Sequence, residues 1–182
     1  MNAATLRAHL AQLDAALAEP ARLCVYGSAA LMLLGEEDRF SVDMDIAGPY
    51  SVVNERALAA AAQRIGWPVN PPDDFTGDYI EWVGPARLCL AAPVMETAPV
   101  VWQGGQLTLF TVTPADLIAS RLVRYDPTDQ ADIQFLQIQA RVRFEEIAAA
   151  ANRLPPSFRD DALVRENLNN LRRDLERWSC GP

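Results

Sequence analysis

Two carboxylates stand close together in the stretch CVYGSAALMLLGEEDRFSVDMDIAG, which runs from Cys24 to Gly48. Asp43 and Asp45 alternate with apolar residues, as in a strand, where side chains two apart share a face. Neighbouring carboxylates repel each other, and a divalent cation relieves that repulsion. Mg²⁺ prefers oxygen ligands and commonly takes one or two carboxylates together with substrate phosphates. The pair therefore predicts a site for Mg²⁺ or Mn²⁺. The residues expected to face the core are Val42, Met44 and Ile46.

A Gly-Ser pair follows the apolar run that precedes these carboxylates. Gly27 allows a sharp turn and a close approach of the backbone. Ser28 is expected to open a helix, whose free N–H groups and positive dipole end attract phosphate. Together the two motifs predict phosphates at the start of a helix and a metal on the next strand. Taken alone, Gly27 and Ser28 are also typical of a plain helix cap, and Asp-x-Asp is typical of a solvated turn or a partner for Arg39.

The elements that position these residues follow from hydrophobic periodicity in the first part of the chain. Apolar residues at helical spacing predict three helices, at 6–17, 29–34 and 53–65. Short apolar or alternating runs bounded by Gly and Pro predict five strands, at 22–26, 42–47, 79–83, 87–91 and 106–112.

From Thr113 onward the sequence predicts helices throughout. TPADLIASRLVRY has Thr at the cap, Pro at the first helical position and Asp in the first turn. Further helices are expected at 127–140 and 141–153, with one long closing helix at 157–178. We therefore expect an α/β (α+β) fold. Residues 1–112 would form the core and residues 113–182 a helical C-terminal part packed on it, with the site in the cleft between them.

Composition limits the class of protein. Half of the 182 residues are hydrophobic and 22% are charged, which suits a globular domain. No apolar stretch reaches the ~20 residues of a membrane span, and the N-terminus lacks a signal-peptide core, so a cytoplasmic protein without a membrane partner is expected. The net charge of −8 disfavours general nucleic-acid binding. Of the three cysteines, Cys24 and Cys89 lie in apolar segments typical of core thiols, and Cys180 lies near the C-terminus.

The stretch YGSAALMLLGEEDRFSVDMDIAG resembles the signature of the DNA polymerase β-like nucleotidyltransferases: Gly-Gly or Gly-Ser, then Asp-x-Asp or Asp-x-Glu on the next strand. It is most similar to the abortive-infection nucleotidyltransferase toxins of the AbiEii family and their uncharacterised relatives. The residues at matching positions are Gly35, Arg39, Ser41, Asp43 and Asp45. A second block, TPADLIASRLVRYDPTDQADIQFL, resembles that family's downstream segment. Its matching residues are Asp116, Leu117, Asp129 and Asp132, and Arg121 stands where a lysine is usual.

The resemblance covers Leu23 to Leu136 and implies a small mixed sheet of the polymerase β-like type. It implies Mg²⁺-dependent transfer of a nucleotide from an NTP to a hydroxyl of RNA, a tRNA 3′ end included, or of a protein. It also implies a toxin–antitoxin or phage-defence system, with a cognate antitoxin as a partner. The implied metal ligands are Asp43 and Asp45, joined in catalysis by Arg121 and Asp132. The implied nucleotide-binding residues are Gly27, Ser28, Arg39, Ser41 and Arg124.

The wider superfamily commonly has a third carboxylate on a neighbouring strand. Candidates for that position are Glu81, Asp78 and Asp132. Arginine at position 121 keeps the charge of the usual lysine but changes its geometry. The alternative function is therefore a catalytically inactive protein of the same fold that binds a nucleotide or a partner. Turnover that disappears on Asp45→Asn would distinguish the enzyme from this binding module.

Overall fold

A computed structural model describes residues 1–179, and the chain divides into two compact units. The first unit comprises Met1–Leu88 and Pro93–Val112, and the second comprises Cys89–Ala92 and the residues from Thr113 onward. Cys180 lies outside the described residues. Within the described part, no helix has the length and apolar character needed to cross a membrane. Strands occur in the first unit and helices in both, so the fold is mixed α and β, and its sheet structure is small.

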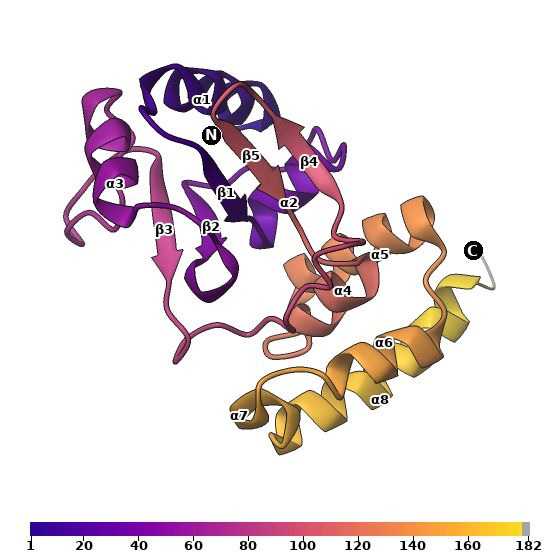
Figure 1. The fold of residues 1–182 in the computed structure, drawn as a ribbon. Helices are drawn as coiled ribbons and strands as arrows, with labels where there is room; N and C mark the ends of the chain where they lie inside the picture. The colour runs from indigo at the N-terminus through magenta and orange to yellow at the C-terminus, as the bar shows by residue number, and fades with distance from the viewer. Residues whose placement is uncertain (180–182) are drawn as a thin grey trace. The chain divides into compact units, whose positions relative to one another are not determined.

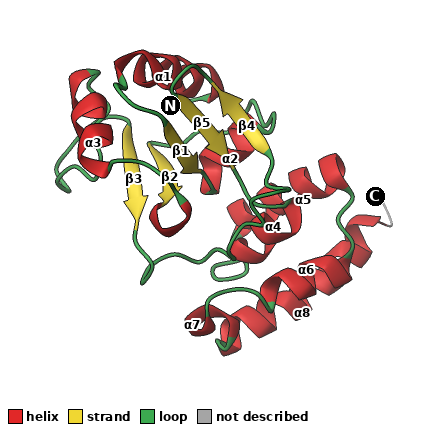
Figure 2. Ribbon diagram, viewed as in Figure 1, coloured by secondary structure: helices red, strands yellow, loops and turns green. Residues whose placement is uncertain are grey.

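The strands of the first unit form two small sheets (Figure 2). In one, β1 (Ala21–Cys24) pairs in parallel with β5 (Leu107–Phe110), which pairs antiparallel with β4 (Val100–Gln103). In the other, β2 (Asp43–Ala47) and β3 (Tyr79–Val83) are parallel. The two sheets meet where Val25 forms a bridge with Ile46 and the Tyr26 N–H donates to the Asp45 carbonyl at 3.1 Å. The end of β1 therefore reaches the middle of β2.

Three α-helices accompany these strands: α1 (Ala3–Ala16), α2 (Gly27–Leu33) and α3 (Glu55–Arg64). A short 3₁₀ helix, η1 (Gly48–Tyr50), follows β2. Helix α1 begins at Asn2, whose side chain accepts from the Thr5 N–H, and it buries one apolar stripe at helical spacing. The residues of that stripe are Leu6, Leu10 and Leu13.

Asp14 joins the last turn of α1 to the start of β5. Its carboxylate accepts three backbone N–H groups, from Gly105 at 3.0 Å and from Gln106 and Leu107 at 2.7 Å each. A Cβ at Gly104 would lie 2.4 Å from the Asp14 Cγ, so glycine is required there. Burial alone would raise the pKa of Asp14, but the three backbone donors hold it below its usual value. The Gly-Gly turn between β4 and β5 is thus a cradle for this carboxylate.

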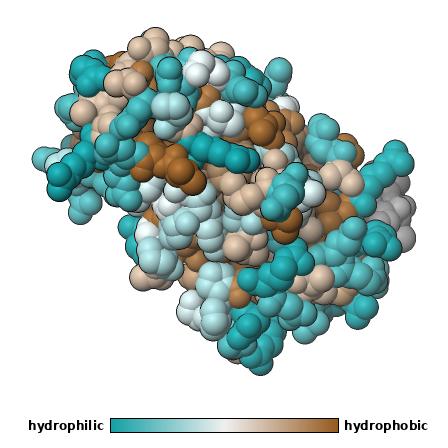
Figure 3. Space-filling view, viewed as in Figure 1, coloured by the Kyte–Doolittle hydropathy of each residue, from teal (hydrophilic) through white to brown (hydrophobic). Residues whose placement is uncertain are grey.

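The second unit consists of helices. They are α4 (Pro114–Arg121), α5 (Pro127–Ala140), α6 (Phe144–Ala151), α7 (Pro156–Arg159) and α8 (Ala162–Ser179). Thr113 caps α4, as predicted, and Asp126 caps α5. Helices α6 and α8 lie side by side (Figure 1), where the Arg172 guanidinium stacks 4.6 Å above the Phe144 ring. Hydrophilic side chains predominate on the face of these last helices seen in Figure 3.

Two predicted elements are wrong, and one strand was missed. Residues 87–91 form no strand, because Arg87 lies in a turn and the residues after it have no ladder partner among the described residues. The missed strand is β4, a four-residue edge strand that depends on pairing with β5. The predicted closing helix at 157–178 is split, because the Asp161 side chain accepts from the Leu163 N–H at 2.8 Å and so starts α8 afresh. In addition, Val42 precedes β2 and is 59% exposed, whereas Met44 and Ile46 are buried as predicted.

Candidate metal and nucleotide site

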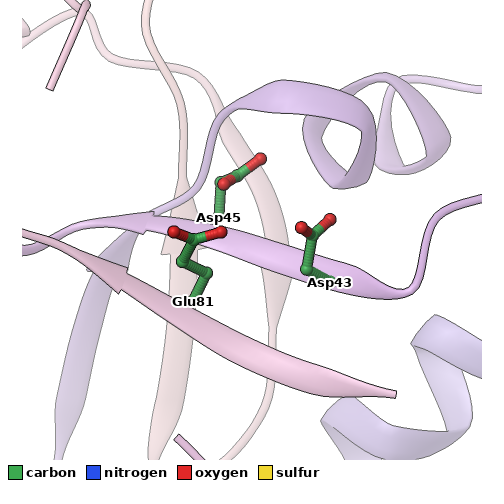
Figure 4. A group of neighbouring side chains, drawn as sticks. All are labelled: Asp43, Asp45 and Glu81. Carbon is green, nitrogen blue, oxygen red and sulfur yellow. The ribbon is translucent and has the colours of Figure 1, made fainter. Parts of the chain in front are cut away.

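Three carboxylates from β2 and β3 form one group, the acidic cluster: Asp43, Asp45 and Glu81. One oxygen of each lies within 4.8 Å of the others. The parallel register of the two strands places Glu81 opposite Asp45. All three side chains point to the same side of the strands (Figure 4). A set of oxygen ligands at this spacing is suited to a hard divalent cation.

Gly27 lies against this cluster at the start of α2. Its φ is +64°, in the left-handed region, and a Cβ there would lie 2.2 Å from the Asp45 Oδ2. Any side chain at this position would displace the carboxylate. The close backbone approach predicted for Gly27 is therefore present, and the group it approaches is Asp45 itself.

Two hydroxyls hold the Asp43 carboxylate. Ser41 Oγ donates to Oδ1 at 2.6 Å, and the Tyr79 hydroxyl lies 3.5 Å from Oδ2. Burial, followed by the negative charges of Asp43 and Glu81, raises the pKa of the Tyr79 phenol. Tyr79 therefore stays neutral and remains a donor over the ordinary pH range. Ser41 was predicted to bind the nucleotide, and the contact that it makes here fixes the orientation of Asp43.

Arg87 forms an ion pair with Glu81. Its side chain is 71% exposed, whereas that of Glu81 is 22% exposed, so the guanidinium approaches the acidic cluster from the solvent side. The hydrogen bond and charge of Glu81 raise the pKa of Arg87, which stays cationic. This arginine was not among the predicted site residues.

A second cation lies beside the predicted phosphate-binding hydroxyl. The Nε and Nη2 of Arg39 donate to Ser28 Oγ at 3.2 and 2.9 Å. Ser28 belongs to the first turn of α2, directly after Gly27. The structure thus brings together within the first unit four of the predicted nucleotide-binding residues and both predicted metal ligands.

The other predicted residues belong to the second unit. Arg121 donates from Nε to Asp132 Oδ2 and from Nη1 to the Leu117 carbonyl, both at 3.0 Å. The side chains of Arg121 and Asp132 are 5% and 2% exposed. Arg124 binds Asp129 at 2.8 Å and is 67% exposed. The catalytic roles of Arg121 and Asp132 and the nucleotide-binding role of Arg124 stay predictions.

Of the three candidates for a third carboxylate, Glu81 is the one that joins Asp43 and Asp45. Asp78 instead lies 3.4 Å from His9, and Asp132 pairs with Arg121. The alternation in YIEWV indicates which residues share a face with Glu81, but its position opposite Asp45 depends on strand register. Tyr79 and Arg87 have no comparable signal in the sequence.

A family model described as "Nucleotidyltransferase of unknown function (DUF6036)" matches residues 4–160. The matched residues include the acidic cluster, the Gly27–Ser28 turn and helices α4 to α6, and they end before α8. Neither the curated proteins nor the solved structures contain a match to the chain.

Proposed function

The chain belongs to this nucleotidyltransferase family, and we propose that it transfers a nucleotide from an NTP to an acceptor hydroxyl with the help of Mg²⁺ or Mn²⁺. The observation that carries the proposal is the acidic cluster, with three carboxylate oxygens within 4.8 Å of one another. The resemblance to the polymerase β-like fold and to the AbiEii-type toxins is part of the same proposal.

The residues present fit a metal ion. Each member of the acidic cluster offers a hard oxygen ligand, and glycine at position 27 leaves room for the Asp45 carboxylate. When bound, such an ion organises the triphosphate and stabilises the charge that develops during in-line transfer. Side-by-side carboxylates in a half-buried setting are otherwise costly, which supports this use of the cluster.

The chain's own residues divide the remaining work. Ser41 and Tyr79 hold the Asp43 carboxylate in place through their hydroxyls. Ser28 and Arg39, already joined, supply a hydroxyl and a guanidinium for phosphate oxygens. Arg124 remains a proposed contact for the triphosphate because it is largely exposed. Arg121 and Asp132 remain proposed catalytic residues; in the helical unit they form a buried pair, with Arg121 Nε donating to Asp132 Oδ2 at 3.0 Å.

The first test is isothermal titration of each NTP in Mg²⁺, repeated in EDTA. The Asp43→Asn/Asp45→Asn variant should lose binding, as should the wild type in EDTA. Asp73→Asn/Asp74→Asn is the matched control, since these two exposed aspartates lie in the same unit and remove the same charge. NTP binding that survives both EDTA and Asp43→Asn/Asp45→Asn would overturn the metal-triphosphate site.

We propose the acceptor by its chemical class: it is a hydroxyl of an RNA or of a protein. Labelled NTP incubated with total RNA and with total protein would show which of them gains label. A toxin role predicts that expression slows growth and that Asp45→Asn relieves the effect. Nucleotide binding without any transfer would favour the inactive binding module instead.

A further inference from the structure

An open, polar pocket of about 380 Å³ lies within the second unit; we call it the α8 pocket. Its volume is within the ~300–1,000 Å³ range of small-molecule sites. Five of its seven lining residues belong to α8, which lies outside the residues matched by the nucleotidyltransferase family. The lining residues are Tyr125, Gln130, Asn167, Asn170, Arg173, Asp174 and Arg177.

Asn167 is a buried amide in the wall of this pocket, with only 6% of the residue exposed. Its Nδ2 donates to the Leu122 carbonyl at 2.8 Å, which fixes the orientation of the amide. Its Oδ1 accepts from no donor in the part of the chain that the structure describes. This oxygen is accessible to solvent, so it is available to accept from a ligand hydroxyl that replaces water in the pocket.

Asp174 is held from two sides. The Tyr125 hydroxyl donates to Oδ2 at 2.7 Å, and Arg177 Nη1 donates to Oδ1 at 3.1 Å. Tyr125 has a φ of +55°, and Gln130 Nε2 donates to its carbonyl at 3.3 Å. These contacts fix the side chains of Tyr125, Gln130 and Asp174, and Arg177 balances the charge of Asp174.

Two arginines give the pocket an excess of positive charge. Arg173 and Arg177 are four residues apart on α8 and therefore lie on the same side of the helix. Arg173 donates to Asn170, and Arg177 donates to Asp174. A guanidinium carries five N–H donors, so each arginine has further donors for an anion. Guanidinium groups recognise phosphate through such donors, frequently in a bidentate manner.

We propose that the α8 pocket binds a ribose-phosphate unit. Arg173 and Arg177 take the phosphate, and the amide oxygens of Asn167 and Gln130 accept from the sugar hydroxyls. A free nucleotide and a strand of RNA both present this unit. The pocket shares no residue with the acidic cluster, and the proposal does not depend on the proposed function.

The test titrates ¹⁵N-labelled protein with ribose 5-phosphate, with inorganic phosphate and with a short single-stranded RNA, without added metal. Ribose 5-phosphate should shift the side-chain amide signals of Asn167 and Asn170 and should bind more tightly than inorganic phosphate. An affinity for the RNA that is higher than for ribose 5-phosphate would assign the unit to a strand, and an equal or lower affinity would assign it to a free nucleotide.

Arg173→Gln/Arg177→Gln should weaken binding of ribose 5-phosphate by at least about tenfold, because two charge-assisted contacts are lost. Arg159→Gln/Arg165→Gln is the matched control, since both arginines are exposed and lie outside the pocket. Equal affinity in the two variants, or no shift at Asn167 and Asn170, would overturn the proposal. Asp43→Asn/Asp45→Asn should bind ribose 5-phosphate like the wild type. The proposal for the α8 pocket can therefore be wrong while the metal-triphosphate site is right, and the reverse.

Discussion

The two units treat their carboxylates differently. In the helical unit, Asp116, Asp129 and Asp132 have side chains only 2–6% exposed, and each forms an ion pair with an arginine. The partners are Arg153 at 2.6 Å, Arg124 at 2.8 Å and Arg121 at 3.0 Å. The charge of each buried aspartate is thus balanced within the unit. Such pairs contribute little net stability when intact but are expensive to break.

The acidic cluster of the first unit is arranged in the opposite way. Its three carboxylates face one another, Asp43 is held by hydroxyls, and Glu81 meets an arginine from the solvent side. The spacing is suited to a shared cation rather than to separate ion pairs. The same residue type is therefore neutralised by arginine in one unit and forms, in the other, a group that could hold a metal ion.

The largest expected effect is on the stability of the helical unit. Asp132→Ala leaves the Arg121 guanidinium buried without its partner, so the free energy of unfolding should fall by about 3–5 kcal/mol. Urea denaturation followed by circular dichroism measures this loss. Asp160→Ala is the control, because Asp160 pairs with Arg159 at the surface and should have no measurable effect.

The paired variant Arg121→Leu/Asp132→Leu sharpens this result. Removing both charges should recover most of the stability that Asp132→Ala loses, because no uncompensated charge remains buried. If Asp132→Ala unfolds no more easily than the wild type, the contrast between the two units is wrong.

The next effect concerns Mg²⁺ and the acidic cluster. At 100 times its dissociation constant, a ligand of the native state raises the free energy of unfolding by about 2.7 kcal/mol. Wild-type protein should show this stabilisation, and Asp43→Asn should show little of it at the same concentration. Thermal melts at increasing Mg²⁺ measure the response. Asp73→Asn/Asp74→Asn should respond like the wild type, and a response of the same size in Asp43→Asn would remove Asp43 from the site.

The negative charge of Asp14 is stabilised in a third way, by backbone N–H donors in place of an arginine or a metal. Asp14→Asn should lower the free energy of unfolding at neutral pH by about 1–2 kcal/mol, because charge-assisted bonds to three N–H groups are weakened. The pKa of Asp14 is lowered in the folded state, so its contribution is full above the ordinary value of 3.8. The contribution is lost as the pH falls through the folded pKa. Denaturation of both proteins at pH 7 and pH 3.5 should show a smaller difference at the lower pH, and a constant difference would contradict the role of the charge.

The smallest effect is expected at Arg87. Removing this exposed cation from Glu81 should lower the dissociation constant for Mg²⁺ without nucleotide by about two- to fivefold, the size typical of a surface ion pair. Titration calorimetry of Arg87→Ala against Arg56→Ala, an exposed arginine of the same unit, provides the comparison. Weaker Mg²⁺ binding in Arg87→Ala would mean that Arg87 supports the cluster rather than competing with the cation.

Local signals predicted much of this fold. The predicted strand at 79–83 coincides with β3, the Thr-Pro pattern located the start of α4, and the predicted helix at 127–140 coincides with α5. Features that depend on distant pairing were harder to predict. Strand β4 forms only against β5, and Glu81 joins Asp45 only through the β2–β3 register, across 36 residues. Glycine at position 27 predicted a close backbone approach, but the sequence did not indicate that the group approached would be Asp45.

The short segment Cys89–Ala92 shows that the helical unit is not continuous in the sequence. It belongs to the helical unit, although β3 precedes it and β4 follows it. Leu90 and Ala91 are at most 1% exposed, so they are part of that unit's interior. A gene cut at Thr113 would therefore split the helical unit and leave part of its core on the other fragment. The two units thus interleave along the sequence. A single fusion or deletion at the C-terminus could therefore neither add nor remove the whole helical unit.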